Sequence, residues 1–317
     1  MKDTKIDVVI PVYKPGMELK ELLRRLSLQR QKIGTVYLMH TKDGNNLKQS
    51  ELTAGYDNII IEEIDLDEFD HGGTRDKGIG MSDSEYVLFM TQDAIPADRN
   101  LTVRLMEAMS DTDVAVAYAR QLPKKDCHLL ERYIRAFNYP AESMVKQKED
   151  LNRLGIKTYF CSDVCALYRK ELYVKQGGFE NRIIFNEDML YAAKSIQNGY
   201  KIVYAADAKV IHSHNYTNMQ QFRRNFDLAV SQVQHPEVFG GVKSEKEGIR
   251  MIKNTALHFI KHGRPMTVVR LLISSAAKYL GYLAGKHYEK LPADIVEKCS
   301  MSPAYWRFYR NSKKSWK

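Results

Sequence analysis

Short hydrophobic segments alternate with amphipathic stretches along the first two thirds of the chain. Runs of about four to eight apolar residues predict buried strands, and apolar residues three or four positions apart predict helices. The expected strands are residues 7–13, 35–39, 58–62, 85–90, 114–118, 159–168, 201–205 and 209–212. The expected helices are residues 18–31, 74–81, 101–109 and 188–197, with 129–139 as a helix or loop. This alternation predicts an α/β fold, a mostly parallel sheet with helices on both faces.

The last third of the chain has an almost wholly helical pattern. We therefore expect an α/β domain over residues 1–235 and a basic helical region over residues 236–317. Within that region, residues 266–284 are apolar on most sides and carry one polar stripe. The stripe consists of Arg270, Ser274 and Lys278. Its charges argue against a membrane-spanning helix, but a packed helix, an oligomer interface and a helix lying in a membrane surface all fit.

Charge is unevenly distributed along the chain. The total is +9, and residues 240–317 hold 16 Lys/Arg against 5 Asp/Glu, so the remainder carries a net charge of −2. A basic region can meet anionic lipid, nucleic acid or an acidic partner, or be a solvated helical surface. The amino terminus enters a strand without a signal-peptide segment, and no long uncharged apolar run follows, so a cytoplasmic protein is expected. Four cysteines form no zinc or disulfide pattern, which agrees with that compartment.

One carboxylate stands where a hydrophobic strand ends. The apolar run 85–90 leads directly into Thr91, Gln92 and Asp93, and Pro96 follows closely. Open α/β sheets bind ligands beyond the carboxyl ends of their strands. Asp and Pro are also common in turns, so Asp93 marks either a turn or a binding site.

Four further segments accompany Asp93. They are residues 9–13 at the first strand end, 71–75 (His-Gly-Gly-Thr-Arg), 185–188 (Phe-Asn-Glu-Asp) and 212–217 (His-Ser-His-Asn-Tyr-Thr). The order of these segments and their residues resemble those of the inverting GT-A glycosyltransferases of family 2. Within that family they resemble the bacterial rhamnosyltransferases of cell-wall rhamnose polysaccharide and O-antigen synthesis. The resemblance covers roughly residues 5–235 and continues into the tail. It implies a Rossmann-like GT-A sheet that binds a nucleotide-diphosphate sugar, followed by a C-terminal helical extension.

The resemblance also implies a divalent cation, Mn²⁺ or Mg²⁺, at Asp93. Such a cation stabilises the leaving diphosphate and takes carboxylate and phosphate oxygens together. The family has an Asp-x-Asp motif here, and Thr91 stands in place of its first Asp, which leaves one carboxylate instead of two. His212 and His214 follow a strand, and in relatives a histidine at this place completes the metal site or touches the diphosphate. As an isolated pair they would be ordinary surface histidines.

Glu187 and Asp188 resemble the Glu-Asp pair that supplies the catalytic base of the family. Inversion requires that the acceptor hydroxyl lose its proton as it attacks the anomeric carbon, and a carboxylate within hydrogen-bond reach can take that proton. We assign Asp188 as the base and Glu187 as its neighbour or an acceptor contact. The structural alternative is a helix start, in which Asn186 or the acidic first turn stabilises the helix.

The donor is expected to meet residues at several strand ends. Arg75 suits a phosphate or a neighbouring carboxylate, and a salt bridge from Arg75 to Asp93 is compatible with that role. Gly72 and Gly73 would let the backbone approach the donor. Many relatives carry an Asp after the second strand for the nucleobase, whereas here Thr41 or the slightly later Asp43 must serve. The full expected donor set is Pro11, Tyr13, Thr41, Asp43, Gly73, Arg75, Gln92, Asp93 and Arg223.

The resemblance therefore predicts transfer of L-rhamnose from dTDP-β-L-rhamnose to a lipid-linked cell-wall polysaccharide acceptor. The enzyme would be peripheral at the inner face of the cell membrane, would bind no nucleic acid, and could form homo-oligomers through its C-terminal helices. One alternative keeps the fold and uses a UDP-sugar donor. Another is a non-catalytic protein that binds anionic lipid or nucleic acid through the basic tail.

Overall fold

The computed structural model describes residues 4–42, 44, 55–241 and 245–312. The described chain divides into two compact units. The sheet unit draws on residues up to 124, 139–181 and 187–212, and the helical unit draws on 125–138, 182–186 and 213–317. The expected division at residue 235 concerns domains rather than these contact-defined units, and it stays a prediction.

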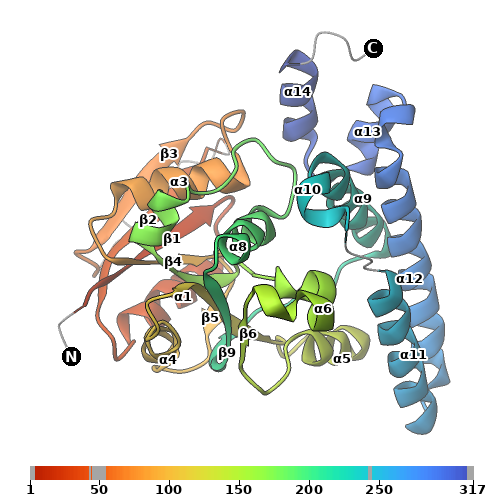
Figure 1. Ribbon diagram of the computed structural model, residues 1–317, viewed down its shortest axis with the longest axis horizontal. Helices are drawn as coiled ribbons and strands as arrows, with labels where there is room; N and C mark the ends of the chain where they lie inside the picture. Colours follow the sequence, from red (N-terminus) through yellow and green to blue (C-terminus); the bar gives the residue numbers. More distant parts are fainter. Residues whose placement is uncertain (1–3, 43, 45–54, 242–244, 313–317) are drawn as a thin grey trace. The chain divides into compact units, whose positions relative to one another are not determined.

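In the described part of the chain, the sheet unit contains one nine-stranded mixed sheet (Figure 1). Its strands are β1 (Ile6–Val12), β2 (Ile33–Thr41), β3 (Ile59–Ile64), β4 (Tyr86–Met90), β5 (Ile95–Pro96), β6 (Val114–Leu122), β7 (Met144–Lys146), β8 (Cys165–Arg169) and β9 (Lys201–Ile211). The order is β3-β2-β1-β4-β8-β6-β9-β5, and β7 pairs with β9. Strands β1 to β4 run parallel, as do β6 and β9, whereas β8 is antiparallel to both β4 and β6. The carboxyl ends of β1, β2 and β4 therefore meet at one edge.

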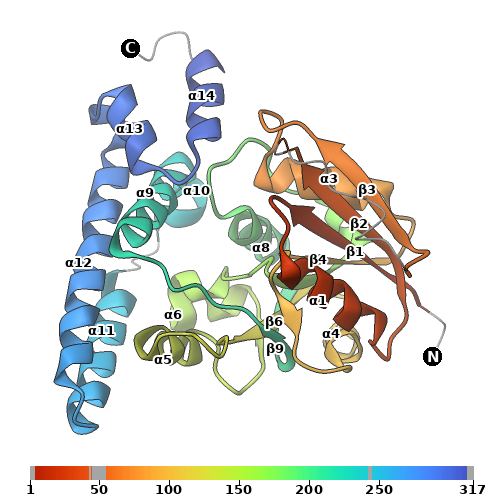
Figure 2. The same ribbon diagram turned by 180° about the vertical axis from the view of Figure 1, so that it is seen from behind.

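Helices cover both faces of this sheet, as the two opposite views show (Figures 1 and 2). Those of the sheet unit are α1 (Met17–Ser27), α3 (His71–Met81), α4 (Leu101–Ala108), α6 (Leu151–Leu154), α7 (Lys170–Lys175) and α8 (Glu187–Gln197). Leucines of α1 join Ile6, Val8 and Ile10 of β1 in the main core. Val9 points the opposite way, towards α3, where a Cβ on Gly78 would collide with it. Successive side chains of a strand point to opposite faces, and helices cover both faces here, so β1 is buried on both sides and is apolar apart from Asp7.

A cluster of aromatic rings holds α8 against the sheet. Tyr191 of α8 lies 5.3 Å from Tyr168 of β8 and 5.1 Å from Tyr173 of α7, measured between ring centroids. Phe89 of β4 lies 5.0 Å from Tyr168, and Phe179 lies 5.8 Å from Tyr191. These edge-on and tilted contacts are the arrangements that aromatic pairs prefer. The cluster fixes the helix whose first turn carries Glu187 and Asp188.

The helical unit is built from α5 (Leu129–Asn138), α9 (Asn218–Gln234), α10 (Pro236–Phe239), α11 (Glu245–Lys261), α12 (Pro265–Lys286), α13 (Ala293–Cys299) and α14 (Pro303–Ser312). Helix α9 begins at a capping box, in which Thr217 and Gln220 satisfy each other's backbone N–H groups. Helices α9 and α12 pack closely because Gly281 and Gly285 of α12 face the main chain of Phe222 and Phe226. Among the described helices, none is both long and apolar enough to cross a bilayer.

The structure changes two of the expected elements. The expected strand 159–168 is wrong in its first half, because the strand starts only at Cys165. A 3₁₀ turn at residues 155–158 precedes this segment. The intervening residues form a loop that turns at the Cys165 N–H to Ser162 carbonyl bond. The two expected strands 201–205 and 209–212 are one strand, β9, whose pairing with β6 shifts register after Ala119. Such an irregularity interrupts the apolar pattern without ending the strand.

Candidate active site

The carboxyl ends of β1 and β4 are joined by one side chain. The Gln92 amide accepts a hydrogen bond from the Tyr13 N–H at 3.0 Å and donates to the Tyr13 carbonyl at 2.9 Å. Next to Tyr13, Lys14 has a φ of +47°, which is uncommon for a residue other than glycine. The paired bonds hold this turn in place. Gln92 thus shapes the loop at the edge where a donor is expected.

Asp93 lies in a turn, which agrees with one interpretation of the sequence, and its carboxylate also belongs to a polar cluster, so its role in binding stays a prediction. The Ala94 N–H donates to the Thr91 carbonyl and closes the turn. The Asp93 Oδ1 lies 3.5 Å from the His212 Nε2, and its Oδ2 lies 3.4 Å from the Lys124 Nζ. Asp93 therefore faces an imidazole and an ammonium group at the end of β4.

His212 is oriented by a hydrogen-bonded chain behind it. The Gln121 amide nitrogen donates to the Tyr139 hydroxyl at 2.7 Å and to the Ser162 hydroxyl at 2.9 Å. Its carbonyl oxygen lies 2.9 Å from the His212 Nδ1. A Gln121 carbonyl oxygen facing Nδ1 favours the neutral tautomer that is protonated there, and in that tautomer the Nε2 lone pair faces Asp93.

The pair formed by Asp93 and His212 fits a divalent cation. In that tautomer both facing atoms carry lone pairs, and a cation between them would relieve their repulsion. A separation of 3.5 Å suits two ligands of one ion, because each bond to it would be about 2.1 Å long. An imidazole held through its other nitrogen is the usual arrangement for a metal ligand. His214 belongs to the helical unit, where its ring stacks on Tyr216 at 5.0 Å, and its role as a ligand stays a prediction.

A second cluster surrounds Arg75 and is buried. The Arg75 Nη1 lies 3.2 Å from the Glu187 carboxylate and donates to the His71 carbonyl at 2.8 Å. Its Nε lies 3.4 Å from the Asp163 carboxylate. Among the described residues, the ion-pair partners of Arg75 are therefore Asp163 and Glu187, and the alternative of a salt bridge to Asp93 is wrong. Removing Arg75 would leave the two buried carboxylates without their cation, which costs several kcal/mol.

Asp188 is held by main-chain groups. Its Oδ2 accepts from the Asp163 N–H at 3.2 Å and its Oδ1 from the Met189 N–H at 2.7 Å. Burial and the nearby Glu187 and Asp163 carboxylates raise the pKa of Asp188 well above its ordinary value, although the two N–H donors oppose the shift. The same burial raises the pKa of Asp163. A carboxyl group with a raised pKa binds a proton more strongly and is a better base near neutral pH.

The remaining expected donor residues lie in several places. Gly73 is the third residue of α3, and its N–H donates to the capping Asp70 side chain at 2.8 Å. A Cβ on Gly72 would lie 2.6 Å from the Glu180 carbonyl oxygen, so close packing already requires that glycine. Thr41 is buried at the end of β2, and its hydroxyl has no hydrogen-bond partner among the residues that the structure describes. Pro11 is part-buried in β1, Arg223 is exposed on α9 in the helical unit, and Asp43 lies outside the described residues.

Sequence reasoning missed three residues of these clusters, namely Gln121, Lys124 and Asp163. Lys124 follows the end of β6, so its place at a strand end was a usable signal. Gln121 and Asp163 carried no such signal. Their importance depends on partners distant in sequence, His212 and Arg75.

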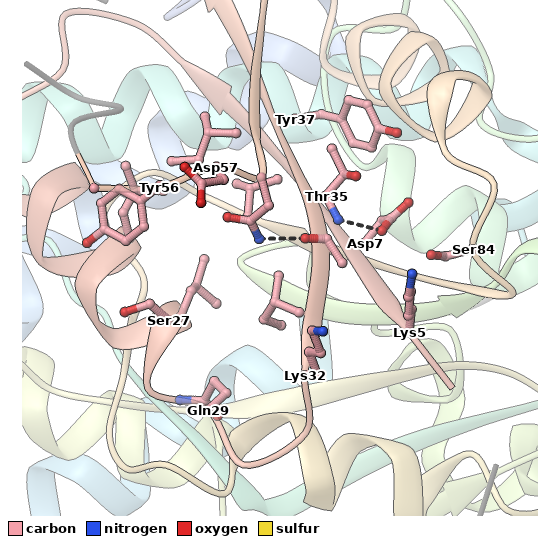
Figure 3. A pocket seen from close by; sticks show the side chains of 18 of the residues that line it. Lys5, Asp7, Ser27, Gln29, Lys32, Thr35, Tyr37, Tyr56, Asp57 and Ser84 are labelled. Carbon is pink, nitrogen blue, oxygen red and sulfur yellow. Dashed lines mark hydrogen bonds between the residues drawn. The ribbon is translucent and has the colours of Figure 1, made fainter. Parts of the chain in front are cut away.

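A cavity of about 1030 Å³ lies at the opposite edge of the sheet (Figure 3). It is lined near the amino ends of β1, β2 and β3 by residues such as Lys5, Lys32 and Asn58. In it the Asp7 carboxylate accepts from the Thr35 N–H at 2.7 Å. Open α/β sheets bind ligands at the other edge. This cavity is therefore separate from the candidate active site.

The sheet and its carboxylate clusters define a sugar-transferring enzyme of the GT-A type. The chain belongs to a known family of such enzymes, because the model "Glycosyl transferase family 2" matches residues 7–177. It is 38% identical over 309 residues to the O-antigen chain rhamnosyltransferase RfbN of Salmonella typhimurium, covering 95% of this chain and 96% of that protein. It is 37% identical to WbaN of Salmonella anatum, covering 94% of this chain and 95% of that one. The expected resemblance to inverting rhamnosyltransferases is confirmed.

Solved structures agree on the fold. The mannosyltransferase PcManGT from Pyrobaculum calidifontis, in complex with GDP-Man and Mn²⁺, matches with a TM-score of 0.56 at 14% identity, covering 98% of this chain and 87% of that one. Residues 1–349 of S. aureus TarS match with a TM-score of 0.54 at 15% identity, covering 90% and 91%. The expected GT-A class is confirmed, and the protein is a glycosyltransferase.

Proposed function

We propose that this enzyme transfers L-rhamnose from dTDP-β-L-rhamnose to a lipid-linked polysaccharide and forms an α-L-rhamnosyl bond. Similarity to two O-antigen rhamnosyltransferases along almost the whole chain supports the sugar and the type of acceptor. The buried Arg75–Glu187 pair beside Asp188 is the observation that carries the mechanism.

This pairing separates the roles of the two adjacent carboxylates. The charge of Glu187 is balanced by Arg75 at 3.2 Å. Asp188 has no ion-pair partner within 4 Å among the described residues, and its two hydrogen bonds come from main-chain N–H groups. Asp188 is thus the carboxylate that remains available to take a proton. In the proposed step it accepts the proton of the acceptor hydroxyl as the oxygen attacks the anomeric carbon, and the bond to the diphosphate breaks with its electron pair on the leaving oxygen.

Asp93, His212 and Lys124 would meet the diphosphate. A bound divalent cation would supply charge neutralisation to the leaving group. Asp93 and His212 would hold that cation, and Gln121 would keep the imidazole in the required tautomer. Lys124 adds a positive charge beside Asp93. At this site Thr91 stands in place of the first Asp of the family motif, so the enzyme has one carboxylate fewer.

Thermal stabilisation by nucleotides tests the donor and the cation. We expect dTDP with Mn²⁺ to stabilise the enzyme more than UDP with Mn²⁺. A ligand present at 100 times its Kd raises the free energy of unfolding by about 2.7 kcal/mol. Asp93→Asn should lose the Mn²⁺-dependent part, whereas Asp207→Asn, at an exposed site on β9, should keep it. Equal stabilisation by UDP would favour the UDP-sugar alternative.

Transfer activity tests the base. Asp188→Asn should lower kcat about 10²- to 10⁴-fold, while nucleotide binding is retained. Full activity in that variant would show that the base is another group. Loss of nucleotide binding as well would show that Asp188 supports the structure of the site and does not act as the base.

We also propose peripheral contact with an anionic membrane surface through α12. Several large apolar side chains of this helix are exposed, including Val269, Leu272, Ile273, Tyr279 and Leu280. Residues 240–317 carry a net charge of +11, which favours anionic lipid headgroups. Leu272→Glu should weaken co-sedimentation with phosphatidylglycerol vesicles without changing sedimentation of the free protein. If Leu272→Glu instead dissociates a homo-oligomer, the exposed face is an oligomer interface.

A further inference from the structure

One lysine side chain is enclosed within the sheet unit. Lys146 is the last residue of β7, which pairs with β9, and only 2% of its surface is exposed. Its Nζ lies 4.8 Å from the centroid of the Tyr118 ring and 5.8 Å from that of the Phe160 ring. Among the described residues, no carboxylate lies within 4 Å of this ammonium group. A buried charge without an ion-pair partner is costly for the fold, so packing alone gives no reason for a lysine here.

Lys146 holds one end of a short irregular loop, residues 160–163. Its Nζ donates to the carbonyl of Phe160, to the carbonyl of Lys157 at 3.4 Å and to the hydroxyl of Tyr118 at 3.2 Å. An ammonium group has three N–H donors, and these three oxygens account for all of them. The lysine thus connects the start of the 160–163 loop to β6.

The other end of the 160–163 loop contacts the proposed base. The Asp163 N–H donates to the Asp188 Oδ2 at 3.2 Å, and the Asp163 carboxylate lies 3.4 Å from the Arg75 Nε. Phe160 precedes Asp163 by three residues, and three residues of chain span at most about 11 Å. All of these residues belong to the sheet unit. Movement of the Phe160 carbonyl would therefore displace the N–H group that holds Asp188.

The charge of Lys146 also acts on Asp188. Burial lowers the pKa of Lys146 to about 8, and the Cys161, Asp150 and Asp188 groups oppose this shift. The side chain is therefore mostly protonated at pH 7. An opposite charge nearby favours the ionised form of a carboxyl group.

Other titratable and charged groups face the same two side chains. Those that face Lys146 are Tyr118, Asp150 and Cys161, and those that face Asp188 are Arg75, Tyr118, Cys161, Asp163, Tyr168 and Glu187.

We propose that Lys146 is a positioning residue for the base: through the 160–163 loop it places the Asp163 N–H on Asp188, and its positive charge stabilises the Asp188 carboxylate. This role rests on the proposed transfer function and adds a residue that touches neither donor nor acceptor. A purely structural role would require the hydrogen bonds of Lys146 but not its charge.

The pH profile of kcat/KM separates the charge from the hydrogen bonds. Lys146→Gln keeps an N–H donor and loses the charge, so the pKa of Asp188 should rise. The acidic limb should then move to higher pH by about 0.5–1 pH unit, less than the 1–3 units typical of an opposite charge at about 4–6 Å. Lys146→Arg keeps the charge and should leave the limb near its wild-type position. An equal shift in both variants would overturn the role of the charge.

Matched variants provide the controls. Lys148→Gln changes an exposed lysine two residues away and should leave the limb in place. Glu187→Gln removes a negative charge and should move the limb to lower pH. If Glu187→Gln moves the limb and Lys146→Gln does not, the role of Lys146 is overturned while the transfer function stands.

A second neutral variant tests the positioning role. Lys146→Met has a similar length, removes both the charge and the hydrogen bonds, and also removes the cost of burying a charge. Its kcat should fall about 10- to 100-fold, because small displacements of catalytic groups are costly. The donor KM and the stabilisation by dTDP with Mn²⁺ should stay unchanged. A wild-type kcat in Lys146→Met, or failure of both neutral variants to fold, would overturn the role.

An NMR titration with ¹³C-labelled aspartate carboxyl groups needs no donor. The Asp188 signal is the one that Asp188→Asn removes. Its titration midpoint should rise in Lys146→Gln and stay in place in Lys148→Gln, even if no donor supports transfer. An unmoved midpoint in Lys146→Gln would overturn the proposal.

Discussion

The close approach of α9 and α12 predicts that a single added methyl group destabilises the helical unit. In Gly281→Ala the new Cβ would lie 2.8 Å from the carbonyl carbon and 3.0 Å from the Cα of Phe222, and closer still to its carbonyl oxygen. Real Cβ atoms essentially never approach other atoms within 3.0 Å, and the obstacle here is main chain, which cannot rotate away. The two helices must therefore move apart.

Two opposing terms decide the size of this effect. Replacing a helical glycine by alanine stabilises a helix by about 0.5–1 kcal/mol. Overpacking costs about 1–3 kcal/mol, and a backbone obstacle favours the upper part of that range. Gly281→Ala should thus lower the free energy of unfolding by about 1–2 kcal/mol.

Thermal unfolding followed by circular dichroism measures the difference. Gly248→Ala on α11 is the matched control, because a Cβ there meets nothing within 4 Å, and this variant should be slightly stabilised. A Gly281→Ala protein as stable as the wild type would refute the reasoning, since the helices would then be farther apart than the structure has them.

Three further predictions concern charge and hydrogen bonding. Glu187→Gln removes a negative charge that raises the pKa of Asp188, so the acidic limb of the pH profile of kcat/KM should move to lower pH. If the limb does not move, Asp188 is not the titrating base. Gln121→Leu should weaken Mn²⁺ binding about 10- to 100-fold in a titration with dTDP present, and unchanged affinity would exclude His212 as a ligand. Burial raises the pKa of Asp227 to about 7, so this carboxyl stabilises the fold when protonated, and that contribution is lost as pH rises from about 4 to about 7. Asp227→Asn should therefore gain up to about 4 kcal/mol over wild type at pH 8, at about 1.4 kcal/mol per pKa unit, and the gain should shrink towards pH 5 in urea titrations.

The sequence predicted the sheet unit well because its strands are buried on both faces. Apolar runs such as 85–90 leave few other structures for the chain to form, and the strand ends then follow directly. The residues it missed depend on tertiary contacts. Asp163 lies in a loop expected as a strand, and only the fold brings it to Arg75. Gln121 sits within β6, and nothing in its own segment indicates that it orients His212.

The helical unit also has a consequence for synthesis of the protein. Residues 125–138 and 182–186 belong to it, yet they are made long before residues 213–317. Ile184 shares a core with Trp306, and Tyr133 of α5 packs on Phe259 of α11. During translation these apolar side chains stay exposed until their partners near the end of the chain are synthesised. Exposed apolar surface in incomplete chains promotes aggregation. A premature stop near residue 235 would therefore produce an aggregation-prone fragment and not a freestanding sheet domain.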